Sequence, residues 1–109
     1  MDPIILNQGM ELAMEFGKNW LQPIQGRLGR KHKDLSRAAL DEYERVCREA
    51  LNYGIEQVKV QMQAAARKEK EAARLFGEIM AGRYPWVTTK TLSHLFSQGC
   101  YYAWKDGEL

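Results

Sequence analysis

Residues 35–81 read LSRAALDEYERVCREALNYGIEQVKVQMQAAARKEKEAARLFGEIMA. This stretch contains no proline, and apolar residues recur in it every three or four positions from Leu40 to Met80, which is the spacing of one helix face. Oppositely charged residues four positions apart add modest helical support on the other faces. The pattern predicts one helix over residues 35–81, about 70 Å long if unbroken, with Gly54 as its weak point.

The segment before this long helix has an apolar stripe of its own. Asp2 followed by Pro3 supplies an N-cap acceptor and a first-turn residue whose missing N–H costs nothing there. Apolar residues then continue at helical spacing as far as Leu28. We therefore expect a helix over about residues 3–28, kinked at Pro23 because proline removes one helical hydrogen bond.

The segment after the long helix predicts a third helix. Gly82 and Pro85 stop the preceding helix, and Thr88 or Thr89 can cap the next one, whose apolar stripe supports a helix over residues 88–106. Nowhere does the sequence alternate with the period of a β-strand. The expected fold is all-α: one helical domain, residues 1–109, with three helices joined by short turns into antiparallel hairpins.

Such a rod would be only two helices thick, so it would leave much of its apolar surface exposed to water. Val46, Tyr53 and Val60 recur every seven residues on another face of the long helix, which is the spacing of a seam with a partner helix. We expect these residues to form the interface of a homodimeric helical bundle. In the alternative, the long helix breaks near Gly54 or within residues 66–72, and the pieces collapse into a compact four-helix monomer.

Composition and termini restrict the environment of the protein. Its net charge of +2 is too small to require a polyanionic partner, so any basic function must come from local clustering. The apolar run at the N-terminus stops at Asn7 and follows no basic region, so we expect no signal peptide and no membrane association. Cys47 and Cys100 suit reduced, buried thiols in the cytoplasm better than a disulfide framework.

Cations cluster in residues 26–37, GRLGRKHKDLSR, which we call the basic turn. Asp34 is its single acid. The residues that could bind an anion or nucleic acid are Arg27, Arg30, Lys31, Lys33 and Arg37. In the alternative, these cations only offset the exposed carbonyl groups at the end of the preceding helix.

Aromatic residues gather near the C-terminus. Trp86, Tyr101 and Trp104 lie off the apolar stripe of the third helix or in the turn before it, so at least one large ring should be exposed. Exposed tyrosine and tryptophan are enriched in protein–protein hot spots. These three residues are therefore candidates for binding a partner, unless the second subunit or the turn buries them.

Signals for catalysis are weak. His32 and His94 have no companion histidine, cysteine or carboxylate at a spacing typical of metal ligands, and the glycines form no phosphate-binding motif. We expect no enzymatic activity, no metal and no cofactor. The interpretation is a homodimeric helical protein that binds an unidentified protein as an adaptor, inhibitor or regulator; the alternative is a nucleic-acid-associated protein that uses the basic turn.

Overall fold

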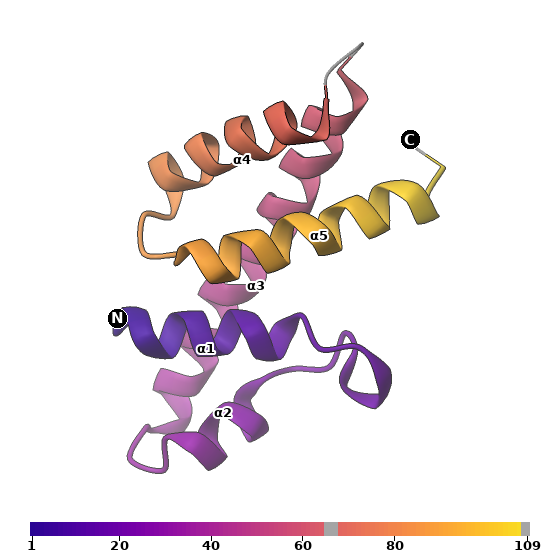
Figure 1. Ribbon diagram of the computed structural model, residues 1–109. Coiled ribbons are helices and arrows are strands. Elements are labelled where there is room, and N and C mark those ends of the chain that lie inside the picture. The colour runs from indigo at the N-terminus through magenta and orange to yellow at the C-terminus, as the bar shows by residue number, and fades with distance from the viewer. Residues whose placement is uncertain (65–67, 108–109) are drawn as a thin grey trace. The chain divides into compact units, whose positions relative to one another are not determined.

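The computed structural model describes residues 1–64 and 68–107. Within these ranges the chain is helical, without strands, which confirms the all-α prediction. Its elements are α1 (Pro3–Ala13), the short 3₁₀ helix η1 (Gly17–Asn19), α2 (Gln25–Lys31), α3 (Arg37–Gln63), α4 (Glu69–Arg83) and α5 (Thr89–Lys105) (Figure 1). None of the helices in these ranges has the length and apolar character that crossing a membrane requires.

The chain divides into two compact units, Met1–Leu51 and Asn52–Leu109, which we call unit 1 and unit 2. Unit 1 contains α1, η1, α2 and the first part of α3. Unit 2 contains the rest of α3 with α4 and α5. The prediction of three helices is therefore wrong, because the described residues form five α-helices.

The expected helix over residues 3–28 is two helices. Backbone φ angles of +81° at Gly17 and +65° at Leu21 are incompatible with a right-handed helix, so the chain leaves the helical path after α1. Pro23 lies in the irregular segment before α2 and kinks no helix. Trp20 and Leu21 match the helical spacing in the sequence, and this match led to the wrong prediction of one continuous helix.

The expected helix over residues 35–81 is also two helices. α3 passes through Gly54 without a break and ends at Gln63, and α4 begins at Glu69 after an extended Lys68. The alternative break within residues 66–72 is the closer prediction, although residues 66 and 67 lie outside the described part. This region offers alanines and charged residues but no large apolar side chain, and packing supplies most of the stability of helices in proteins.

The core of unit 1 forms where α1 and α2 meet α3. Met10, Ile24, Leu28 and Cys47 are fully buried there. Gly9 permits the close approach of α1 to α3, because a Cβ atom at this position would lie 2.7 Å from Cys47 Sγ. Small residues at the crossing therefore bring the two helices together.

The N-terminus of α1 is capped and tied to α3. The carboxylate of Asp2 accepts a hydrogen bond from the Ile4 N–H at 2.8 Å, as the sequence predicted for this N-cap. The Asp2 N–H donates to the hydroxyl of Tyr43 in α3 at 3.0 Å.

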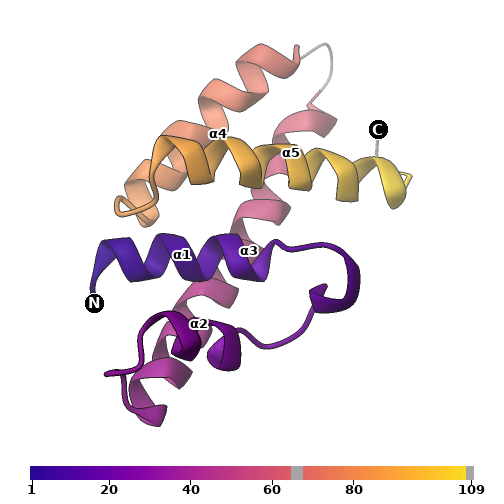
Figure 2. The same ribbon diagram turned by 60° about the horizontal axis from the view of Figure 1, so that its bottom comes forward.

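The core of unit 2 contains an antiparallel hairpin of α4 and α5 (Figures 1 and 2). The rings of Phe76 and Phe96 lie 5.6 Å apart between the two helices. Thr88 caps α5 by accepting the Thr91 N–H at 3.3 Å, so the helix expected over residues 88–106 is confirmed as Thr89–Lys105. The hydrogen bond at Thr88 thus marks where α5 begins.

Candidate binding surfaces

Two aromatic rings near the end of α5 form an exposed pair, which we call the aromatic surface. Trp104 is 68% exposed and Tyr101 is 38% exposed, which confirms the expectation that at least one large ring faces solvent. Their ring centroids lie 6.2 Å apart with an interplanar angle of 41°. The pair thus presents apolar area on a helix whose other side is buried at Ala103.

The helix beneath this surface is fixed to α3 at two levels. Gly99 packs on Val58, where a Cβ atom on the glycine would lie 2.6 Å from Val58 Cβ. Further along, Lys59 Nζ pairs with Asp106 Oδ2 at 2.8 Å. The hydrogen bond from Lys59 lowers the pKa of Asp106 below its ordinary value. The rings are therefore carried by an anchored element of unit 2.

Trp86 does not belong to the aromatic surface. It is half-buried in the connection between α4 and α5, and its ring lies 6.0 Å from that of the buried Tyr84. Tyr101 lies twelve residues after the first residue of α5, Thr89, which corresponds to about 18 Å along the helix. The three aromatic residues predicted to act together therefore lie towards opposite ends of α5.

The residues expected at the dimer seam differ in accessibility. Val46 is half-buried, whereas Val60 is 48% exposed. Tyr53 packs edge-on against Tyr84 at 5.7 Å, and the Arg83 guanidinium lies 4.3 Å above its ring centroid. The ring of Tyr53 thus has contacts within unit 2. Among the three residues expected at the seam, Val60 has the largest exposed fraction.

One cation of the basic turn is bound within the fold, and the others are exposed to solvent. Arg27 is largely buried and pairs with Glu15 at 3.2 Å, so its guanidinium serves the fold. Arg30, Lys31 and Lys33 are exposed, and within residues 1–64 and 68–107 none of them has an ion-pair partner. Arg37 makes a contact of 3.3 Å with Asp41 between two exposed side chains.

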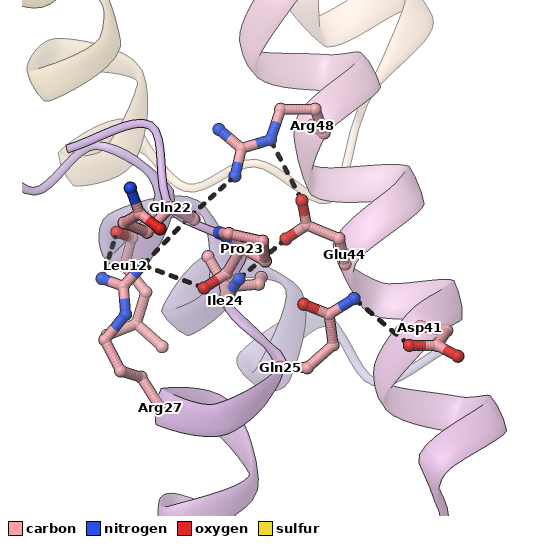
Figure 3. A network of polar contacts seen from close by, with 9 residues as sticks. All are labelled: Leu12, Gln22, Pro23, Ile24, Gln25, Arg27, Asp41, Glu44 and Arg48. Atoms are coloured by element: carbon pink, nitrogen blue, oxygen red, sulfur yellow. Dashed lines mark hydrogen bonds and ion pairs between the residues drawn. The ribbon is translucent and has the colours of Figure 1, made fainter. Parts of the chain in front are cut away.

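Sequence reasoning missed a surface loop, residues 14–24, which the helical pattern had assigned to a helix. The loop is held by arginines that donate to its carbonyl groups (Figure 3). Arg27 reaches the carbonyl oxygens of Leu12, Gln22 and Pro23 at 2.9, 3.2 and 3.4 Å. These hydrogen bonds fix both ends of the loop to α2.

α3 holds the same loop from the other side. Arg48 also donates to the Gln22 carbonyl oxygen, at 3.2 Å, and is oriented by Glu44 through a contact of 3.1 Å (Figure 3). Glu44 in turn accepts the Ile24 N–H at 3.0 Å. A carboxylate and a guanidinium from one helix thereby fix the backbone of residues 22–24.

The anchored loop exposes apolar side chains. Leu21 is 68% exposed and Phe16 is 53% exposed, and Phe16 packs edge-on against Trp20 at 5.4 Å. Leu21 also adopts a positive φ, which costs a residue with a Cβ about 1–2 kcal/mol. The sequence does contain a signal for this loop, because the turn-forming residues Gly17 and Pro23 bracket it.

The two cysteines are free. Cys47 is buried and donates to the Leu6 carbonyl oxygen at 3.3 Å, and burial raises the pKa of its thiol to about 12. Burial also raises the pKa of the Cys100 thiol. Neither thiol is activated as a nucleophile, and no group of three possible metal ligands occurs in the described ranges.

No protein-family model, curated protein or solved structure matches this chain. Functional inference therefore depends on the surfaces described above.

Proposed function

We propose that this chain is a non-enzymatic helical protein that binds another protein through the aromatic surface. The observation that supports this function is the 68% exposure of Trp104 beside the ring of Tyr101. Tryptophan and tyrosine dominate binding hot spots because they bury a large area with few rotatable bonds. An adaptor, inhibitor or regulator in the cytoplasm is the corresponding class of protein, and two free cysteines fit that reducing compartment.

The anchoring of α5 supports the proposal further. A rigid platform loses little conformational entropy when it binds, so more of the contact energy appears as affinity. Val58 and Lys59 of α3 hold α5 on either side of the ring pair. The rings are therefore preorganised for a partner.

The test is a comparison of two double variants. Photo-crosslinking from position 101 would identify a partner, which is then purified and titrated. Trp104→Ser/Tyr101→Ser should weaken binding by about 30-fold or more, which corresponds to the 2 kcal/mol typical of a hot spot. Phe16→Ser/Leu21→Ser removes exposed apolar side chains from unit 1 and should leave this affinity unchanged. Equal losses in both variants, or no loss in the first, would reject the aromatic surface.

Self-association is a second candidate, and the 48% exposure of Val60 on α3 favours it. We propose a homodimer whose seam includes the exposed side of α3 at Val60. Light scattering should then give twice the 12.6 kDa mass of one chain. Val60→Glu should return the mass to that of one chain without lowering helicity by circular dichroism, and a wild-type mass of one chain at high concentration would exclude the dimer.

A further inference from the structure

Four exposed cations lie between the end of α2 and the start of α3, and we call them the basic segment: Arg30, Lys31, Lys33 and Arg37. Asp34 is the only acid between them in sequence. The side chain of Arg37 is 83% exposed, so its contact with Asp41 leaves the guanidinium in solvent. The segment therefore concentrates positive charge in a chain of net charge +2.

Arg45, Arg48 and Arg74 are each paired with an acid on the same helix. Arg45 contacts both Glu42 and Glu49 in α3, and Arg74 contacts Glu78 at 2.8 Å in α4. Arg30, Lys31 and Lys33 have no such partner within the described ranges. The basic segment is thus a local excess of charge rather than a part of the usual surface pattern.

The position of two of these four cations is explained by the end of α2. Arg30 and Lys31 lie in the last turn of α2, where cations offset the exposed carbonyl groups. Lys33 lies beyond α2, and Arg37 is the first residue of α3, whose first turn contains no acid. Cations are unfavourable at the positive end of a helix, so the helix dipoles do not explain these two residues, although Arg37 contacts Asp41 in α3.

We propose that the basic segment binds the phosphate backbone of double-helical nucleic acid. Its cations are spread over eight positions of the chain, which suits a row of phosphates better than a single small anion. No phenylalanine, tyrosine or tryptophan occurs within residues 26–37, so the segment itself supplies no such ring to stack on an unpaired base. Binding should therefore be independent of base sequence and of the aromatic surface.

The number of cations that contact phosphates determines how strongly the affinity for the duplex depends on salt concentration. Each neutralised phosphate of a duplex contributes about −0.9 to the slope of log affinity against log salt concentration, so four contacts give about −3 to −4. Between about 50 and 200 mM NaCl the affinity should fall roughly 100-fold. Arg27 adds nothing to this slope, because its guanidinium is bound to Glu15 and to backbone carbonyl groups.

The experiment is fluorescence anisotropy with a labelled DNA duplex of about 20 base pairs, titrated with the full chain at several salt concentrations. The variant Arg30→Gln/Lys31→Gln/Lys33→Gln/Arg37→Gln changes the net charge from +2 to −2 by removing four cations. The matched control Lys18→Gln/Lys68→Gln/Lys70→Gln/Lys90→Gln removes the same number of exposed cations elsewhere. Circular dichroism establishes that both variants keep the helical content of the wild type.

The proposal is supported if the variant of the basic segment loses binding to the duplex at low salt while the affinity of the control variant stays within about threefold of the wild-type affinity. Equal losses in the two variants would show a dependence on net charge alone and would overturn the proposal. So would a wild-type chain that does not bind the duplex at low salt. Vesicles of phosphatidylcholine with phosphatidylserine form a second arm, and retention of the wild type on these vesicles without binding to DNA would assign the segment to lipid instead.

Discussion

Gly99 of α5 lies so close to Val58 of α3 that a Cβ atom on the glycine would meet the Val58 Cβ at 2.6 Å. A reciprocal contact lies one turn earlier, where a Cβ atom on Gly54 would come within 2.5 Å of Leu95. The two contacts advance in the same direction on both helices, so α3 and α5 cross in a broadly parallel sense. Each glycine accommodates a branched side chain of the other helix, and this crossing determines which face of α5 carries the aromatic surface.

Gly99→Ala should therefore destabilise the protein. Alanine is the better helix former by about 1 kcal/mol, but the new methyl group meets the branch point of Val58, which cannot rotate away. Overpacking of this kind costs typically about 1–3 kcal/mol. Urea denaturation should show a lower free energy of unfolding.

Gly77→Ala in α4 is the matched control, because a Cβ atom there meets nothing within 4 Å. It should raise the free energy of unfolding by about 0.5–1 kcal/mol. A change of the same sign in Gly99→Ala and Gly77→Ala would contradict the packing described for α3 and α5.

Arg27 should stabilise the loop over residues 14–24. Arg27→Met keeps much of the apolar stem but leaves the carbonyl groups of Leu12 and Gln22 without this donor. We expect the free energy of unfolding to fall by about 1–3 kcal/mol and limited proteolysis to become faster within the loop.

Arg45→Met is the control for Arg27→Met. It breaks contacts between side chains that are 50–60% exposed, and exposed ion pairs contribute little to stability because water and salt screen them. A smaller loss for Arg27→Met than for Arg45→Met would disprove the anchoring role.

Leu21 offers a test of backbone strain. Glycine adopts the observed φ of +65° without a steric penalty, whereas alanine keeps the penalty. Leu21→Gly should therefore be more stable than Leu21→Ala by about 0.5–1 kcal/mol, after the greater flexibility of glycine in the unfolded chain is subtracted. Thermal denaturation of the two variants measures this difference, and greater stability of the alanine variant would mean that residue 21 does not hold a positive φ in solution.

The residues that sequence reasoning placed correctly are those governed by local chemistry. The cap at Asp2 and a threonine cap at position 88 or 89 were predictable because each depends on residues two or three positions away, and the structure has the second cap at Thr88. The exposure of Trp104 followed from its angle around α5. Local signals therefore gave the helical class, the bounds of α5 and the exposed ring.

The features that the sequence could not show depend on contacts between distant positions. Arg27 donates to the Leu12 carbonyl oxygen, fifteen residues earlier in the chain. The sequence of the basic turn therefore did not show that this guanidinium is already engaged within the fold. Phe16, Trp20 and Leu21 satisfy the helical spacing whether or not they form a helix. Tyr53 matches a seven-residue repeat, and the sequence did not show that Tyr84 and Arg83 contact its ring within the same unit.

The environment of Cys47 predicts a pH-dependent difference between the two thiols. Its pKa of about 12 means that, in the folded state, only about one Cys47 thiol in ten thousand is ionised at pH 8. Native protein should therefore react with a thiol-specific disulfide reagent mainly at the less buried Cys100. The variant Cys100→Ser should show almost no labelling at pH 8, and its labelling rate should increase as the pH rises, because a higher pH increases the thiolate fraction. Labelling at the rate of an unfolded thiol in that variant would mean that α1 does not cover Cys47 in solution.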